Sequence, residues 1–297
     1  MSRNRAYPSD TTDAEWAVLE PVVPAVKPGG RPAKHDRRAI VDAIFYVNRT
    51  GCSWRSLPID FPHWMTVYSY FREWKQAGVY ARLNDTLRKD VRQRAGRNAV
   101  PTAGIIDSQS VKTSEKGGFK GYDGGKKIKG RKRHLIVDTL GLLLKVKVLP
   151  ANVSDREGGK GLLEELHKEQ PTLKLHLFAD GGYQGPWEAW VKANIGFTVE
   201  IVKRSDFNVR GYRLREGQEL TEEQIRTFRG NRSFVVVKKR WIVERSIAWM
   251  TFQRRLNRDY ELLPETTEAW VTLTFIRLMI RRLAQPLDQP EPSQVAA

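Results

Sequence analysis

The sequence predicts an α/β protein in which a basic, helical N-terminal module precedes a sheet flanked by helices. Apolar residues recur at helical spacing as far as Arg94, whereas from Thr102 onward short apolar runs alternate with amphipathic segments. Strands followed by helices and then by further strands are typical of α/β folds. We therefore expect a helical domain over residues 1–100 and an α/β domain over residues 101–284.

The helical module begins after Ser9-Asp10-Thr11-Thr12, a run of capping residues before the apolar segment Glu15–Leu19. Apolar residues at helical spacing predict a second helix around Ile40–Val47, which ends near Gly51. Thr66 is expected to cap a third helix with an aromatic face, and Gly78 to end it. A fourth amphipathic helix is predicted over Val79–Arg94. Exposed arginines around this aromatic core are compatible with a helix-turn-helix-like reader of DNA.

Five strands and several helices are expected in the second part of the chain. The strands are predicted at Gly104–Asp107, Arg133–Asp138, Leu142–Leu149, Leu173–Ala179 and Phe197–Val202. The helices are predicted at Ser154–Glu169, Pro186–Ala193, Lys238–Leu256 and Glu265–Leu283. The polar stretch at 208–234 indicates an insertion with a short helix near 221–228. The Pro- and Gln-rich segment 285–297 predicts a disordered tail.

The charge balance points to a nucleic-acid partner. The chain has 51 Lys and Arg against 34 Asp and Glu, a formal net charge of +17 and a pI near 10.0. Such an excess, mixed with many aromatic residues, is typical of proteins that bind phosphate-rich polymers. The most apolar late stretch contains Arg277, Arg281 and Arg282, so we expect no membrane span, and the first residues indicate no secretory signal. A single cysteine, Cys52, favours a reducing cytosol.

Three acidic residues are the candidates for chemistry. Asp107 and Asp180 each end an apolar strand, and Glu244 lies on a predicted helix between Arg240 and Arg245. If the two strands are neighbours in one sheet, both Asp carboxylates project at the same edge. Each Asp alone is more often a turn residue, but three converging carboxylates require divalent cations, and oxygen ligands favour Mg²⁺ or Mn²⁺. Two such ions are the usual clamp for phosphoryl transfer.

Basic residues gather close to Asp107 in the sequence. We expect a Gly-rich segment after the first strand to contact DNA phosphates. Its candidate residues are Lys112, Lys126, Lys127, Lys129, Arg131, Lys132 and Arg133. Arg254 and Arg255 either contact phosphate or are solvated cations. Among the other polar residues we favour packing for His134, a helix cap for Asp155 and a structural role for Asp138.

Several sequence blocks resemble bacterial insertion-sequence DDE transposases of the IS-five-like family. The blocks are Gly104–Lys112, Gly130–Leu142, Ala151–Glu157, Ala179–Tyr183 and Trp241–Arg245, and the similarity extends to Trp54–Pro58 and Tyr68–Trp74. The resemblance implies a ribonuclease-H-like catalytic domain with a mixed five-stranded sheet. It also implies that Asp107, Asp180 and Glu244 are the catalytic and metal-binding acids.

The resemblance further implies an activity, cofactors and partners. It predicts a transposase that binds the terminal inverted repeats of its element, cleaves the ends and joins them to target DNA. Two Mg²⁺ ions per site, replaceable by Mn²⁺, and a homodimer or larger assembly on double-stranded DNA in the bacterial cytoplasm are expected, with Arg240 and Arg245 contacting DNA. The related signature has a Tyr and a Lys where this chain has Val237 and Thr251. A Mg²⁺-dependent nuclease and a non-catalytic DNA-binding protein therefore remain alternatives.

Overall fold

The computed structural model describes residues 7–25, 35–115, 117–202 and 240–286, with the side chain of Arg240 left out. The predicted insertion at 208–234 and nearly all of the predicted tail lie outside these residues. The N-terminal helices are α1 (Asp13–Leu19), α2 (Arg37–Thr50), α3 (Trp64–Gln76) and α4 (Val79–Arg94), with a 3-10 turn, η1 (Trp54–Ser56). A capping box between Thr12 and Glu15 starts α1, as expected, whereas α3 is capped by His63 rather than by Thr66.

The second part of the chain alternates strands and helices. The strands are β1 (Ala103–Lys112), β2 (Gly121–Asp123), β3 (Ile128–Asp138), β4 (Leu143–Pro150), β5 (His176–Ala179) and β6 (Thr198–Ile201). The helical segments are α5 (Asp155–Glu169), η2 (Gly181–Tyr183), α6 (Pro186–Asn194), α8 (Arg240–Thr251), η4 (Arg254–Leu256) and α9 (Pro264–Ala284). The five expected strands are all present, and β2 is an additional short one.

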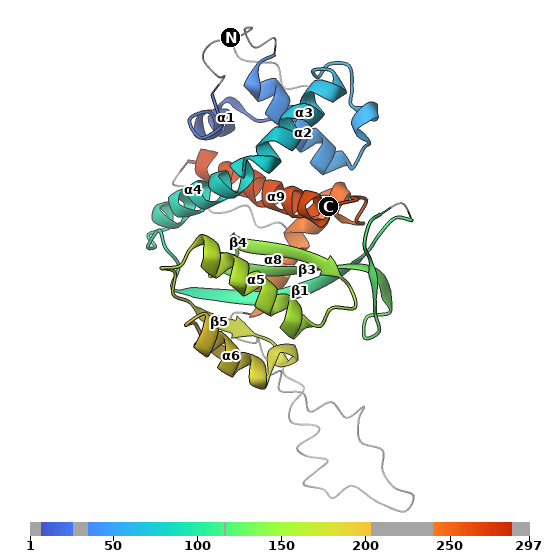
Figure 1. Cartoon of the computed structure of the whole chain (residues 1–297). Helices are drawn as coiled ribbons and strands as arrows, with labels where there is room; N and C mark the ends of the chain where they lie inside the picture. Colours follow the sequence, from blue (N-terminus) through green and yellow to red (C-terminus); the bar gives the residue numbers. More distant parts are fainter. Residues whose placement is uncertain (1–6, 26–34, 116, 203–239, 287–297) are drawn as a thin grey trace, which may run out of the picture.

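The strands form one mixed sheet. In the order β2-β3-β1-β5-β6, β3 is antiparallel to β1 and to β4, whereas β5 is parallel to β1 and β6 is parallel to β5. Helices cover both faces: α5 and α6 lie in front of the sheet in Figure 1, and α8 lies behind it. Ile106 and Leu177 face the α5 side, while Ile105 and Phe178 face α8, as the alternation of side chains along a strand requires.

Several element boundaries differ from the predicted ones. The prediction that the first strand ends at Asp107 is wrong, because Ser108–Lys112 pair with Gly130–His134 of β3. Strand β3 starts at Ile128, five residues before the predicted start at Arg133, and β5 starts only at His176. Helix α8 ends at Thr251 instead of continuing to Leu256, and an extended residue, Gln253, separates it from η4. The predicted strand ends were wrong where polar residues continue the ladder.

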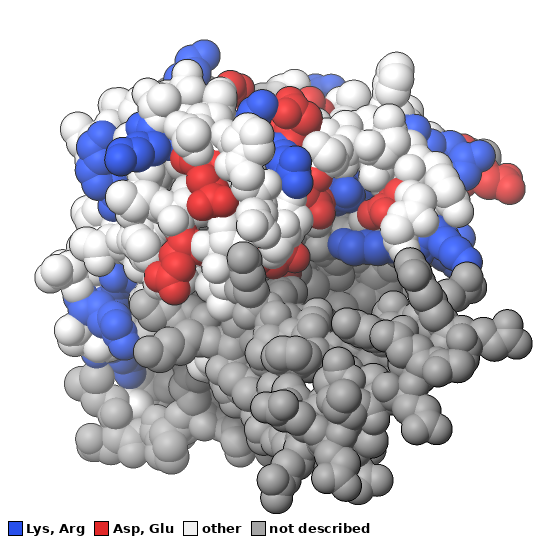
Figure 2. Space-filling model, turned by 90° about the horizontal axis from the view of Figure 1, so that it is seen from below, with Lys and Arg blue, Asp and Glu red and all other residues white. Residues whose placement is uncertain are grey.

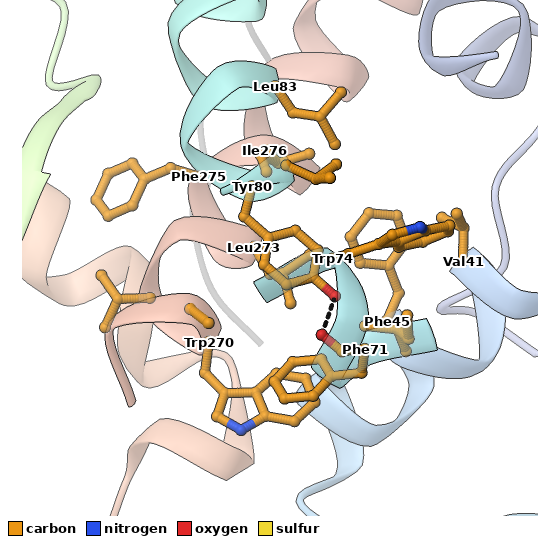
Figure 3. Close-up of a cluster of buried hydrophobic side chains, with 14 of the residues drawn as sticks. Val41, Phe45, Phe71, Trp74, Tyr80, Leu83, Trp270, Leu273, Phe275 and Ile276 are labelled. Atoms are coloured by element: carbon orange, nitrogen blue, oxygen red, sulfur yellow. Dashed lines mark hydrogen bonds between the residues drawn. The ribbon is translucent and has the colours of Figure 1, made fainter. Parts of the chain in front are cut away.

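The core of the N-terminal helices includes the last helix of the sheet-containing part. Trp270 of α9 stacks on Phe71 of α3 with 4.4 Å between ring centroids, and the Tyr80 hydroxyl donates to the Phe71 carbonyl at 3.4 Å (Figure 3). A buried ion pair of 2.9 Å joins Arg277 of α9 to Glu15 of α1. The division of the chain near residue 100 stays a prediction, but the hydrophobic core crosses it.

A second buried ion pair ties the helical part to the sheet. Arg92 of α4 donates to Asp138 at 2.6 Å, and both side chains are at most 5% exposed. The other carboxylate oxygen of Asp138 accepts from the amides of Leu140 and Leu142 at 2.9 Å, which closes the turn between β3 and β4. The structural role predicted for Asp138 is confirmed.

Candidate active site

Asp107 and Asp180 lie at matching positions on neighbouring parallel strands. Ile105 of β1 pairs with Phe178 of β5, and each acid follows its strand residue by two positions. Because side chains alternate along a strand, both acids face the side of the sheet on which Ile105 and Phe178 contact α8. The expectation that these two strands are neighbours is confirmed. The sheet therefore brings two half-buried carboxylates to one face, where β1 continues beyond the last residue of β5.

Backbone amides hold both carboxylates. Asp107 Oδ1 accepts from the Ser108 amide at 2.7 Å, and Asp180 Oδ1 accepts from the Gly182 amide at 2.9 Å as the cap of η2. Both acids also make interactions with further groups of the protein.

A buried tyrosine lies among the acids of the site. Tyr183 is 1% exposed and packs against Trp187 with 4.8 Å between ring centroids. Burial raises the pKa of the Tyr183 hydroxyl well above its usual value, and the negative charges of Asp155, Asp107 and Asp180 raise it further. The same phenol therefore experiences three carboxylates, two of which are the candidate acids Asp107 and Asp180. Within the described residues its oxygen has no hydrogen-bond partner.

Asp155 is the third acid that acts on Tyr183, and its predicted role as a helix cap is wrong. Ser154 caps α5, accepting from the Glu157 amide, and Asp155 is the first residue of the helix. Asp155 Oδ1 instead accepts from the Ser108 hydroxyl at 2.8 Å and pairs with Lys132 Nζ at 3.0 Å. Burial opposes its ionisation, but these two partners lower the pKa of the Asp155 carboxyl below its ordinary range.

Glu244 lies on α8, which packs against the same face of the sheet. Ile242 and Val243 are buried against β1, β3 and β5, whereas the Glu244 side chain is exposed. Within the described parts of the chain, no three His, Cys, Asp or Glu side chains lie close enough together to hold a metal ion. The structure thus places Asp107 and Asp180 at corresponding positions of neighbouring chain segments and Glu244 on a helix that covers the same face of the sheet.

The predicted phosphate-binding cations fall into two groups. Those with exposed side chains are Lys112, Lys126, Lys127, Lys129 and Arg254. Lys126 lies close to the acids, because its ammonium group donates to the Ser108 carbonyl at 3.3 Å. On the face seen from below, basic and acidic side chains of the described residues are interspersed (Figure 2). These exposed cations are compatible with the predicted role.

The prediction that Arg131, Lys132 and Arg133 face DNA is wrong. Both arginines are fully buried, and Lys132 is 6% exposed. Arg131 pairs with Asp259 at 3.2 Å, and Arg133 donates to the Leu256 carbonyl at 2.8 Å. Because these residues lie in β3, which has neighbours on both edges and cover on both faces, their charges are used inside the protein.

Two further arginines predicted to contact DNA make internal contacts. Arg245 stacks between Trp241 and Trp249, at 4.6 and 4.8 Å from the ring centroids, and donates to the Leu140 carbonyl. Arg255 pairs with Glu261 at 2.6 Å and donates to the Cys52 carbonyl at 2.9 Å. Arg255 therefore joins η4 to the helical part, and the prediction of a solvated or DNA-bound side chain is wrong for it. The side chain of Arg240 lies outside the described residues.

His134 is packed, as predicted. It is fully buried on β3, and burial lowers its pKa to about 4. A Cβ atom at Gly158 of α5 would lie 2.2 Å from the His134 ring, so only glycine allows this contact. Ser108 and Tyr183 were not among the predicted site residues, although both follow a candidate acid within three residues. That proximity was the available signal.

None of the described helices is both long enough and apolar enough to cross a membrane.

Comparisons with known proteins identify two matching family profiles. Residues 98–279 match the family described as "Transposase DDE domain", and residues 11–84 match "Putative transposase of IS4/5 family". A protein of Burkholderia cepacia, named "Insertion element IS402 uncharacterized 16.2 kDa protein", is 31% identical over 108 residues, which are 34% of this chain and 71% of that protein.

Two solved structures align with most of the chain at a low score. They are the "Crystal structure of the Mos1 Strand Transfer Complex", with 14% identity and a TM-score of 0.22, and the "Crystal structure of a pre-cleavage Mos1 transpososome", with 10% identity and a TM-score of 0.23. The first alignment covers 80% of this chain and 83% of that one, and the second covers 79% and 81%.

Proposed function

The chain belongs to the DDE-domain transposases, and we propose that it binds the terminal inverted repeats of its own insertion sequence, cleaves DNA at the ends and joins them to target DNA. The mixed sheet flanked by helices is the ribonuclease-H-like fold expected for such a protein, preceded by a helical region. Asp107, Asp180 and Glu244 are the proposed catalytic acids.

The observation that carries this proposal is the matching position of Asp107 and Asp180 on β1 and β5. Two carboxylates at corresponding positions of neighbouring parallel segments, each accepting from a backbone amide, form a preorganised set of oxygen donors. Glu244 supports the proposal less directly, since its helix packs on the same face of the sheet. Preorganised donors are worth more than mobile ones because they need no rearrangement at the moment of reaction.

The donor set suits a hard divalent cation. Asp107, Asp180 and Glu244 offer only carboxylate oxygens, the ligands that Mg²⁺ and Mn²⁺ prefer. We propose that Asp107 and Asp180 hold two such ions and that Glu244 joins them. When bound, the ions polarise phosphate oxygens and neutralise the charge of the reacting groups. Without them, the neighbouring Asp side chains repel one another, and the amides of Ser108 and Gly182 offset part of that repulsion.

DNA contacts are proposed for two parts of the chain. The exposed lysines at 112, 126, 127 and 129, together with Arg254, are the proposed phosphate contacts, and Lys126 donates to the carbonyl of Ser108, the residue after Asp107. Residues 1–100 are the proposed DNA-binding domain. Bringing two element ends together requires at least a homodimer, and we propose that this assembly acts on the bacterial chromosome in the cytoplasm.

A strand-transfer assay tests the proposal. The purified protein is incubated with labelled duplexes copied from the DNA that flanks its reading frame, with Mg²⁺ or EDTA. Metal-dependent nicks and joined products are expected for the wild type. Both products disappear in Asp180→Asn, whereas Asp90→Asn, an exposed acid of α4, retains them.

DNA binding is measured in parallel by gel shift. Asp180→Asn should retain the affinity for the element ends, and that affinity should fall steeply as salt rises. Nicks without joined products would show that the protein is a nuclease and does not transfer strands. Salt-sensitive binding without cleavage in any sample would leave a non-catalytic DNA-binding protein.

A further inference from the structure

The first two residues of α5 contact the residues that hold both proposed catalytic acids: Ser108 in strand β1 and Gly182 in η2. We propose that Asp155 and Arg156 are positioning residues that brace Asp107 and Asp180 in a fixed relative position before metal binds. The inference rests on the proposed function, because it takes these two acids as the metal ligands. It adds residues on a different element, which the family profile and the relatives do not assign.

The contact with Asp107 runs through Ser108. The Ser108 amide donates to Asp107 Oδ1 at 2.7 Å, and the Ser108 hydroxyl donates to Asp155 Oδ1 at 2.8 Å. Ser108 is 7% exposed, and both bonds are partly buried. Lys132 pairs with the same oxygen of Asp155 at 3.0 Å and offsets the charge of a third acid beside the first two. One residue thus links two carboxylates.

The contact with Asp180 runs through Gly182. The Gly182 amide donates to Asp180 Oδ1 at 2.9 Å, while Arg156 Nε donates to the Gly182 carbonyl at 3.1 Å. A Cβ at Gly182 would lie 3.0 Å from Asp180 Oδ1 and 3.6 Å from Asp155 Oδ2. The carboxylates of Asp155 and Asp180 therefore both lie beside the α-carbon of Gly182, on the side that a Cβ would occupy.

The start of α5 is itself held firmly. Ser154 caps the helix, and glycines at 158 and 159 let it approach the sheet closely. A Cβ at Gly158 would overlap the buried His134 ring, and one at Gly159 would lie 2.9 Å from the Tyr183 ring. Because the helix packs against β3 and η2 at the same turn, the positions of its N-terminal residues are fixed relative to the sheet. These residues can therefore hold both acids in place.

The chain contains a matched control for the Ser108–Asp155 pair. Ser110, two residues further along β1, donates to Asp123 Oδ2 at 2.6 Å, and Asp123 lies 3.7 Å from Lys132. This second pair has the same chemistry, the same strand and the same lysine, but no described contact with Asp107 or Asp180. A role of Asp155 in positioning predicts that only the first pair affects the acids.

The test compares Asp155→Asn and Ser108→Ala with Asp123→Asn and Ser110→Ala in the full-length protein. Hydrogen exchange is followed in the metal-free state by mass spectrometry of peptides that cover residues 105–110 and 180–184. Asp155→Asn should exchange about tenfold faster in both peptides, since a hydrogen bond to a charged group is weakened. The control variants should leave both peptides unchanged.

Metal binding provides the second measurement. Titration with Mn²⁺ alone, followed by calorimetry, should show about 10–100-fold weaker binding for Asp155→Asn and Ser108→Ala, the range found when partners of metal ligands are removed. Ser108→Thr retains the hydroxyl and should restore wild-type binding. In cleavage assays the Mg²⁺ concentration at half-maximal rate should rise, while the rate at saturating Mg²⁺ recovers most of its wild-type value.

The outcomes distinguish this inference from the proposed function. If the wild type binds Mn²⁺ and cleaves DNA, but Asp155→Asn behaves like Asp123→Asn, the brace is refuted and the transposase activity stands. If Asp155→Asn unfolds, Ser108→Ala and Ser108→Thr decide, because the first loses the bond and the second keeps it. A wild type that neither binds Mn²⁺ nor cleaves DNA overturns both proposals.

Discussion

Two glycines of α5 should respond in opposite directions to the same substitution. A Cβ at Gly158 would lie 2.2 Å from both Cε1 and Nε2 of His134, a fully buried ring. A Cβ at Gly161 would lie 3.2 Å from Lys147 Nζ, the flexible end of a partly exposed side chain. Gly158→Ala and Gly161→Ala therefore separate the intrinsic helix preference of alanine from the cost of overlap.

The expected magnitudes follow from these distances. Alanine in a helix interior is favoured over glycine by about 1 kcal/mol, and this gain applies at both positions. Carbon atoms in contact prefer separations of about 3.5–4.0 Å, so the overlap at Gly158 exceeds 1 Å. Overpacking of this kind costs about 3 kcal/mol at the upper end of the usual range. We expect Gly158→Ala to lower the free energy of unfolding by about 2 kcal/mol and Gly161→Ala to raise it by up to about 1 kcal/mol.

Urea unfolding followed by circular dichroism measures both changes. At an unchanged slope, the midpoint should fall for Gly158→Ala and rise for Gly161→Ala. Equal shifts of the same sign would refute the reasoning, because they would mean that the contact between α5 and His134 does not constrain the helix. Unfolding data at pH 7 keep His134 neutral in both variants, since its pKa is about 4.

Three further predictions concern buried charges. Burial lowers the pKa of His134 from 6.5 to about 4, so the free energy of unfolding should fall by about 3 kcal/mol as the pH drops from 6.5 to 4. In urea titrations, His134→Phe should lose this pH dependence. Burial raises the pKa of Glu268 from 4.5 to about 7, so the free energy of unfolding should fall as the pH rises from 4.5 to 7. Glu268→Gln still accepts from the Val148 amide and should raise the free energy of unfolding by up to about 3 kcal/mol at pH 8. No gain at pH 8 would contradict the assignment. Asp138→Ala leaves the Arg92 guanidinium buried without its carboxylate and should cost about 3–5 kcal/mol in thermal or urea unfolding, whereas a loss below about 1 kcal/mol would show that water replaces the pair.

The sheet edge with the two acids was predictable because its signals are local. Short apolar runs followed by an Asp are visible at Asp107 and Asp180, and the pairing of β1 with β5 confirms that the two runs are neighbours. The catalytic role of these acids stays a prediction. Ser108 was overlooked because a polar residue after a predicted strand end looks like part of a loop, whereas the ladder continues through it to Lys112.

The burial of the basic residues in β3 could not be predicted from local sequence patterns. A run of Arg and Lys normally indicates a solvated surface, yet Arg131 is buried because Asp259, 128 residues later, neutralises it. Glu261 does the same for Arg255, and Asp155 for Lys132. Burial of a cation depends on a distant partner and on strands that cover it from both sides, and neither is contained in a window of neighbouring residues.

The position of α9 has a consequence for the order of events during synthesis. Trp270 and Arg277 complete the core around Phe71 and Glu15, yet they leave the ribosome 199 and 262 residues after those partners. Chains usually fold domain by domain from the N-terminus as they emerge. Here the apolar surface of the N-terminal helices that α9 covers stays exposed until the end of the DDE region has been synthesised. A chain interrupted before α9 therefore lacks a finished N-terminal core, and the proposed DNA-reading helices acquire their shape only in a molecule that also carries all three proposed catalytic acids.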